Sequence, residues 1–328
     1  MRLSNTGCLL IFVVLSGPAF GIDHALIEKA EKGDAAAQTQ IARQLYNGDG
    51  VPKNINGAVI WFRKAADQGY GEAQAELGVM YFTGDGVPID RTAGLNFLKE
   101  AAEKNMGSAA FVLGSIYQTG NGVPMDNTEA ARWYRKGAEA GNAMAQFQLG
   151  VMDNYGNGLP KNVAEAIVMF RKAADQGLAL AQFALGTQYF VGNGMPQDCS
   201  EAEKWFLKAA DQGIAEAQNK LGFMYSRGEG IPRDDAKAVR FFQAAALQGN
   251  AEAEGSIGYM YARGEGVPKN VVLADAWLMV AGSRGYESAL KNRGVVEKSM
   301  SEQELADAAK VAGQLGEQLK QNSATNRH

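Results

Sequence analysis

The chain has 328 residues, with 32 basic and 36 acidic side chains and a formal net charge of −4. Charges this balanced and this evenly mixed leave no basic patch of the kind that binds nucleic acid, so we expect no nucleic-acid partner. Length alone would suggest about two domains. An internal repeat overrides that estimate, because an array is one body that grows by stacking units.

The first 21 residues have the features of a secretory signal peptide. Arg2 is their only charge, residues 8–15 are an uninterrupted apolar run, and the small residues Ala19 and Gly21 follow at the positions a cleavage site requires. The apolar run is much shorter than the about 20 residues that a membrane-spanning helix needs. We therefore predict cleavage, a periplasmic or secreted mature chain, and no stable membrane insertion.

Cleavage leaves Cys199 as the one cysteine of the mature chain. An internal disulfide is then excluded, and stability must come from packing. Cys199 follows Asp198, an expected helix start, where a thiol can become reactive. We favour an incidental surface thiol on a monomer, with a Cys199-linked dimer as the alternative.

Seven loops of the form Gly-x-Gly-apolar-Pro recur at intervals of 36 residues, and we number each repeat from the first glycine of its loop as position 0. These glycines are Gly48, Gly84, Gly120, Gly156, Gly192, Gly228 and Gly264. Position −11 is alanine in every copy, position −7 is leucine or isoleucine, and position −3 is tyrosine in five copies. Apolar residues spaced by four predict one face of a helix, which we call helix A.

The loop is predicted to end helix A and to start a second helix, helix B. Glycine suits the left-handed position after a helix, and proline cannot continue one. An asparagine or aspartate stands two residues after each proline, from Asn54 to Asn270, where it can cap helix B. A phosphate-binding loop would follow a strand and usually carry a lysine, and no strand pattern precedes any copy. We interpret the loop as a connector.

Helix B carries a large residue nine positions after the proline and a small residue four positions later, an arrangement that lets adjacent helices approach closely. All four tryptophans of the chain, Trp61, Trp133, Trp205 and Trp277, occupy the large position.

The whole unit resembles the Sel-one-like repeat, a 36-residue relative of the tetratricopeptide repeat. The resemblance rests on the pattern A-x-A-Q-x-x-L-G-x-x-Y-x-x-G-x-G-V-P-x-D followed by A-x-x-W-F-x-K-A-A-x-Q-G, which residues 73–104 and 217–249 match well. It implies an all-α fold, an α/α solenoid with a right-handed superhelix of seven repeats over residues 34–285, that binds other proteins. Some relatives staple each repeat with a disulfide, and this chain lacks those cysteines.

Both ends of the array are expected to be capped. Residues 22–33 align with the second half of a repeat and predict a lone N-terminal capping helix. Within residues 286–320, Ser301 and Glu304 form a capping box, and an apolar stripe from Leu305 to Leu319 is expected to cover the last repeat. We expect residues 321–328 to be a disordered tail.

Positions −9, −5 and −1 of helix A share one stripe, which in helical-repeat arrays faces the concave side. Aromatic residues beside arginine are the composition of interface hot spots. For the phenylalanines at position −9, packing in the core is an equal alternative. The binding residues that we predict are Phe147, Val151, Tyr155, Phe183, Phe223, Arg227, Tyr259 and Arg263.

Residues with catalytic chemistry are few. His24 and His328 stand at opposite ends, so no histidine triad or histidine-based metal site can form within the array. Ser288 and Lys291 match the S-x-x-K pattern of serine β-lactamases, but its partner motifs are missing. Asp153 replaces the tyrosine of position −3, and we interpret it as a carboxylate turned to water rather than a polar contact inside the groove.

The sequence therefore predicts a non-enzymatic scaffold, without metal or cofactor, that binds a peptide or protein in a concave groove. One alternative is a peptidoglycan or other carbohydrate fragment or a host factor as the ligand. A less favoured one is a hydrolase that uses carboxylates or Ser288.

Overall fold

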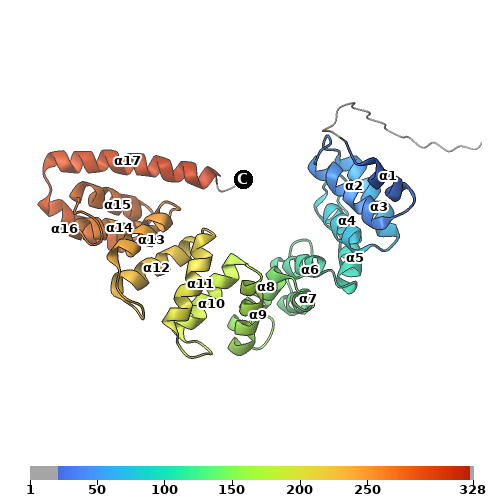
Figure 1. Ribbon diagram of the computed structural model, residues 1–328, viewed down its shortest axis with the longest axis horizontal. Coiled ribbons are helices and arrows are strands. Elements are labelled where there is room, and N and C mark those ends of the chain that lie inside the picture. The colour runs from blue at the N-terminus through green and yellow to red at the C-terminus, as the bar shows by residue number, and fades with distance from the viewer. Residues whose placement is uncertain (1–20, 326–328) are drawn as a thin grey trace, which may run out of the picture. The chain divides into compact units, whose positions relative to one another are not determined.

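The structure, a computed structural model, describes residues 21–325, and these residues form helices and loops without a strand (Figure 1). The predicted signal peptide lies outside the described residues except for Gly21, and so do residues 326–328. The all-α prediction is confirmed.

Helices A and B alternate along the chain as predicted. Helix A corresponds to α2 (Ala35–Asn47), α4 (Gly71–Thr83), α6 (Gly107–Thr119), α8 (Ala143–Tyr155), α10 (Ala179–Val191), α12 (Ala215–Arg227) and α14 (Ala251–Arg263). Helix B corresponds to α3 (Ile55–Asp67), α5 (Arg91–Glu103), α7 (Asn127–Glu139), α9 (Val163–Asp175), α11 (Cys199–Asp211), α13 (Asp235–Ala246) and α15 (Val271–Ser283). The flanking elements are α1 (His24–Glu31), α16 (Glu287–Val296), the short 3-10 helix η1 (Glu297–Ser299) and α17 (Glu302–Thr325).

The second loop shows why each connector has its sequence. Gly84 ends α4 in the left-handed conformation, with φ of 82°. The backbone N–H of Asp90 donates to the carbonyl of Tyr81 (2.9 Å), and the Asp90 carboxylate caps α5; an equivalent backbone bond closes all seven loops. Gly86 also has a positive φ, and a Cβ there would lie 2.2 Å from Cγ2 of Ile55, at the start of the preceding helix B. A Cβ at Gly84 would also lie 2.5 Å from Cγ1 of Ile89, so conformation and space both favour glycine at the two positions.

The helices gather into two compact units that divide within α8. The first unit extends to Ala145 and includes Asn157–Leu159, and the second contains Gln146–Gly156 and continues from Pro160. In the first unit, Phe62 and Leu77 are buried in one cluster, and Leu98 and Leu113 in the next. Each unit is therefore held by packing between consecutive helices.

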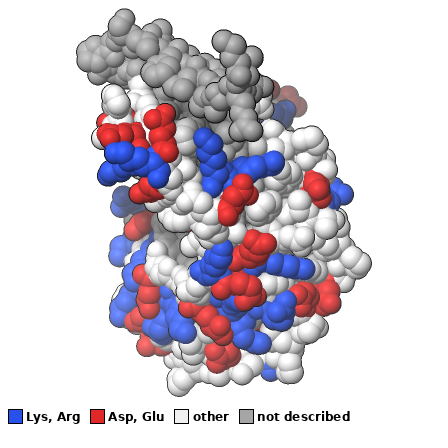
Figure 2. Space-filling view, turned by 90° about the vertical axis from the view of Figure 1, so that its right-hand side faces the viewer, with Lys and Arg blue, Asp and Glu red and all other residues white. Residues whose placement is uncertain are grey.

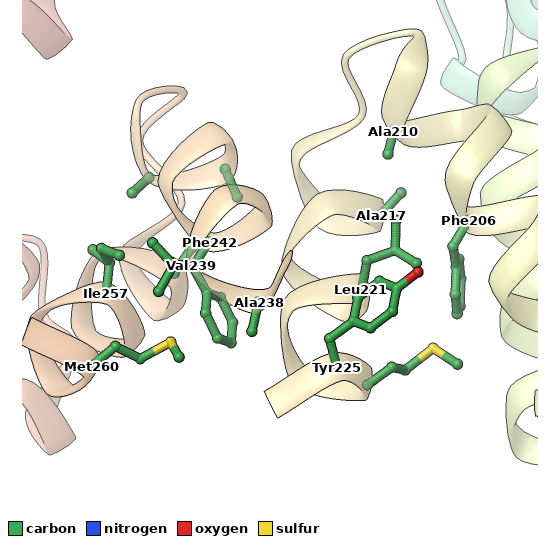
Figure 3. Packing of buried hydrophobic residues seen from close by; sticks show 14 of the residues in the cluster. Phe206, Ala210, Ala217, Leu221, Tyr225, Ala238, Val239, Phe242, Ile257 and Met260 are labelled. Atoms are coloured by element: carbon green, nitrogen blue, oxygen red, sulfur yellow. The ribbon is translucent and has the colours of Figure 1, made fainter. Parts of the chain in front are cut away.

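The core of the second unit joins α11, α12, α13 and α14 (Figure 3). Phe206, Leu221, Phe242 and Ile257 belong to this buried cluster. Phe242 approaches α12 closely because Gly222 has no side chain; a Cβ there would lie 2.6 Å from the Phe242 ring. Large residues thus meet glycine where helices A and B cross.

The last helix, α17, packs on α15, and Leu319 is buried in the core of the second unit. The capping box is confirmed, since the backbone N–H of Ser301 donates to Glu304 Oε2 (2.8 Å) and that of Glu304 to Ser301 Oγ (3.3 Å). We expected a disordered tail from residue 321; in the structure α17 is described as far as Thr325. The side-chain amide of Asn322 anchors it by donating to the carbonyl of Leu247 (3.0 Å).

Candidate functional site

A cleft of about 440 Å³ opens in the second unit, where α12, α14 and α16 succeed one another. This volume is in the usual range for a ligand site. Its lining combines three exposed or half-buried aromatic rings with arginine, serine and asparagine side chains. The main lining residues are Phe223, Arg227, Arg233, Ser256, Tyr259, Glu265, Tyr286 and Asn292.

The cleft lies where the repeats lose a phenylalanine. In the fourth and fifth repeats, position −9 is Phe147 or Phe183, each half-buried, with its ring centroid 5.9 or 5.7 Å from a helix B phenylalanine. In the last two repeats the same position is Asn219 and Gly255. The absence of a large side chain at this position leaves the space between α14 and α16.

Two aromatic residues at position −5 form the walls of this space on the helix A side. Phe223 packs edge-to-face on Phe242, with ring centroids 5.0 Å apart. Tyr259 keeps 42% of its surface exposed. On the opposite side, Tyr286 lies so close to Gly255 that a Cβ on that glycine would be 2.6 Å from its ring. The walls are therefore aromatic, and one of them depends on a glycine.

Arginines lie over these aromatic rings. The guanidinium of Arg227 is 4.7 Å from the ring centroid of Phe223 and pairs with Glu229 (3.2 Å). That of Arg263 is 5.4 Å from the ring centroid of Tyr259 and pairs with Glu265 (2.6 Å), and hydrogen bonding to Glu265 raises the pKa of Arg263.

A third arginine, Arg233, pairs with Asp235 through two hydrogen bonds (2.7 and 2.8 Å). Since a guanidinium has five N–H donors, each of the three keeps donors for a ligand. Stacking and pairing hold these arginines in place before a ligand binds.

The structure separates the predicted binding residues into two groups. Phe223, Arg227 and Tyr259 line the cleft, and Arg263 flanks it through its contact with Tyr259. The other four lie on α8 and α10: Tyr155 is 70% exposed, and Phe147, Val151 and Phe183 are half-buried. Binding at any of these positions remains a prediction.

Our sequence analysis missed most of the cleft, including three polar or aromatic residues that lie outside helices A and B. Arg233 belongs to a loop, and Tyr286 and Asn292 lie after the last helix B. Tyr286 directly follows Gly285, where the repeat register ends. The segment after Gly285 could have been recognised as the start of a further helix A. Nothing in the repeat spacing, however, indicates where the ring of Tyr286 would pack.

The burial of Asp153 contradicts our interpretation of it from the sequence. Its side chain is not turned to water, because the residue is only 5% exposed. Position −3 faces the interior of a repeat whether tyrosine or aspartate occupies it, so burial follows from the position and not from polarity.

The other candidate residues do not assemble a catalytic site among the described residues. Ser288 is exposed on α16, and no hydrogen bond to Lys291 is present there. Cys199 is a free, half-buried thiol at the start of α11; a Cβ on Gly230 would lie 2.2 Å from its own Cβ. The thiol is thus partly covered by the next loop and not fully on the surface.

Charges of both signs alternate on the molecular surface. The face shown in Figure 2 has Lys and Arg side chains beside Asp and Glu, with no field of one sign. Within residues 21–325, no helix has both the length and the apolar character needed to cross a membrane.

Comparisons with known proteins agree with the repeat architecture. The Sel1 repeat model matches seven consecutive segments, residues 35–70, 71–106, 107–142, 143–178, 179–214, 215–250 and 251–285. A crystal structure of a Sel1 repeat protein from Oxalobacter formigenes is similar at 34% identity with a TM-score of 0.63, over 81% of this chain and 77% of that one. The comparison with curated proteins gives no match.

Two other solved structures are more distant. A protective antigen present in uropathogenic Escherichia coli strains, which displays an SLR fold, is 24% identical with a TM-score of 0.37, over 92% of this chain and 88% of that one. An immunity protein from Pseudomonas aeruginosa is 20% identical with a TM-score of 0.40, over 65% of this chain and 81% of that one.

Proposed function

This chain belongs to the Sel1 repeat family, and we propose that it is a protein-interaction scaffold that holds a peptide or protein segment in the cleft of its second unit. The observation that carries the proposal is the convergence of Phe223, Tyr259 and Tyr286 with Arg227 and Arg233 in one cleft of about 440 Å³. Aromatic residues and arginine contribute most of the binding energy at protein interfaces.

The cleft suits an extended segment with one apolar or aromatic side chain. The space beside Gly255 and Ser256 takes that side chain, and the aromatic walls remove it from water. Arginine donors at the rim are then available for backbone carbonyls or a carboxylate of the partner. Because Arg227 already stacks on Phe223 and Arg233 is already paired with Asp235, binding requires little further ordering of the receptor.

We also propose that the mature protein acts in the periplasm or outside the cell. Support comes from the charge at Arg2, the apolar run at residues 8–15 and the small residues Ala19 and Gly21. Mass spectrometry of the protein from an expressing cell tests this, with a mature N-terminus at Ile22 as the expected result. An intact Met1 in the envelope or culture medium would contradict cleavage.

A photo-crosslinking experiment tests the cleft. A benzoylphenylalanine replaces Tyr259 in one version of the mature chain and Val168, an exposed residue of α9 on helix B, in the control. After irradiation in envelope extract, we expect a defined protein cross-linked from position 259 and not from position 168. Its capture should be lost when Phe223→Ala is added.

The same experiment distinguishes the alternatives. Cross-linking of glycan fragments alone from position 259 would favour a carbohydrate ligand. Equal capture from both positions would place binding outside the cleft. For a hydrolase, turnover that depends on Ser288 would be required, and activity unchanged by Ser288→Ala would remove this residue as the nucleophile.

A further inference from the structure

A ladder of buried glutamines links successive repeats through position −10. The side-chain amides of Gln38, Gln182 and Gln218 donate to the carbonyl eight residues earlier, at 2.9, 3.3 and 3.1 Å. Each amide oxygen then accepts from a glutamine thirty residues later, as Gln218 does from Gln248 at 2.8 Å. In the second repeat, Gln74 accepts from Lys104 Nζ instead (2.9 Å). The member of each of these pairs at position −10 is therefore a neutral amide that both donates and accepts.

In two repeats both members of this pair of side chains differ from glutamine. Where position −10 is Ala110, the residue thirty positions later is Ala140. In the last repeat the pair becomes Glu254 and Arg284. Only in that repeat is the buried amide replaced by an acid.

Glu254 occupies the glutamine position with no exposed surface. Arg284 Nε lies 3.1 Å from its Oε1, but neither carboxyl oxygen has a hydrogen-bond partner among the described residues. In the other repeats the side-chain N–H of the glutamine at position −10 donates to the backbone carbonyl eight residues earlier. For Glu254, the residue eight positions earlier is Ala246. A carboxyl group placed as the glutamine amides are would face the Ala246 carbonyl: an ionised carboxylate would be repelled by it, whereas a protonated one could donate to it as glutamine does.

We propose that Glu254 is a proton-controlled link that sets the position of Tyr286 in the cleft. Neutral Glu254 completes the ladder by donating to Ala246, and ionised Glu254 instead draws Arg284 toward itself. The coupling between Glu254 and Tyr286 does not depend on a ligand, whereas a role for it in regulating binding rests on the proposed function of the cleft.

The path from Glu254 to the cleft is short. Arg284 ends α15, and Tyr286 follows two residues later as the residue before α16. Gly255, next to Glu254, contacts the Tyr286 ring and lines the cleft. A movement of Arg284 is therefore transmitted to Tyr286, which forms one wall of the cleft. Glu254 itself directly precedes Gly255, which lines the cleft.

The charged groups around the link are few. Arg284 faces Glu254 from the end of α15, and α13 presents the Ala246 carbonyl. On α16, Arg293 is engaged by Asp275 (3.0 Å) and Glu297 (2.7 Å). Burial raises the pKa of Glu254 to about 7, because Arg284 offsets only part of the desolvation.

Carbon-13 NMR on the mature chain, residues 22–328, tests the proposal without a ligand. Carboxyl-labelled glutamate reports Glu254, identified as the resonance that Glu254→Gln removes, and ring-labelled tyrosine reports Tyr286, identified with Tyr286→Phe. Between pH 5 and 8.5 we expect both signals to shift with one midpoint near 7. In Glu254→Gln the Tyr286 shift should vanish, and in the control Glu287→Gln, an exposed acid of α16, it should persist.

A Glu254 midpoint near its ordinary value of 4.5 would overturn the proposal, as would a Tyr286 signal that does not change with pH or that still shifts in Glu254→Gln. The double variant Glu254→Gln/Arg284→Gln recreates the pair of Gln218 and Gln248, so it gives the same test where the single variant is unstable. A Tyr286 signal that follows the protonation of Glu254, together with no protein cross-linked from position 259, would reject the proposed function and leave the proton-controlled link standing.

Discussion

Replacing Glu254 by glutamine should make the last repeat more stable at neutral and alkaline pH. The folded-state pKa of Glu254 is about 7 and its ordinary value is 4.5, so the folded protein binds the proton more tightly. Stability from this group is then fully present below pH 4.5, falls as the pH rises to 7, and stays low above it. At about 1.4 kcal/mol per pH unit, the loss is at most about 3 kcal/mol.

Glutamine keeps the acceptor for Arg284 and supplies the donor for the Ala246 carbonyl, so the variant should escape this loss. We expect Glu254→Gln to exceed the parent by up to about 3 kcal/mol at pH 8 and to equal it near pH 4. Hydrogen exchange of the α14 amides measures this locally, which matters because repeats unfold in segments. Glu287→Gln is the matched control. An α14 stability difference that is the same at both pH values, or a less stable variant at pH 8, would refute the reasoning.

Three further substitutions test the packing and the loops by urea or thermal unfolding. Leu221→Ala, in the buried core of the second unit, should cost about 2–5 kcal/mol, whereas Val191→Ala on the surface should cost under about 0.5 kcal/mol. Gly86→Ala should destabilise more than Gly141→Ala, since both have a positive φ but a Cβ has open space only at Gly141; equal losses would reject the clash. Asp198→Ala removes the cap of α11 and should cost about 1 kcal/mol, and no change would show that water replaces the cap.

The elements and their boundaries could be predicted from sequence because they depend on near neighbours. Asp90 caps the helix that it starts, and Gly84 ends the helix that precedes it. These interactions span only a few residues and recur seven times, so the pattern can be checked against itself. The end of α17 was predicted less well, because Asn322 is anchored by Leu247, far away in the sequence.

Burial and the location of the cleft could not be obtained in the same way. Asp153 was expected at the surface because of its charge, yet its position in the repeat is interior. The cleft depends on Tyr286, which lies after the last repeat, and on the absence of a side chain at Gly255. Residue types at single positions do not say which side chains fill a space and which leave it open.

Several departures from the repeat pattern coincide in the last two repeats, and this favours a functional explanation for them there. The last two repeats, like the first two, lack the phenylalanine that the middle three have at position −9. They alone combine an aromatic residue at position −5 with arginine at position −1. The last one also exchanges a neutral rung of the ladder for Glu254 and Arg284. Drift in an array scatters changes over the copies, as Ala110 and Asp153 illustrate, whereas the combination of an aromatic residue and arginine occurs in the two adjacent copies that form the cleft.

These changes instead surround a single cleft, and each alters a different property. Gly255 leaves room for a ligand side chain, and Tyr259 and Arg227 provide groups that can contact the ligand. Glu254, next to Gly255, makes this part of the cleft sensitive to protonation. A buried acid costs stability that glutamine would keep, and its place beside the cleft favours a function that uses its titration. Unchanged cross-linking by Glu254→Gln at both pH 6 and pH 8 would remove that explanation.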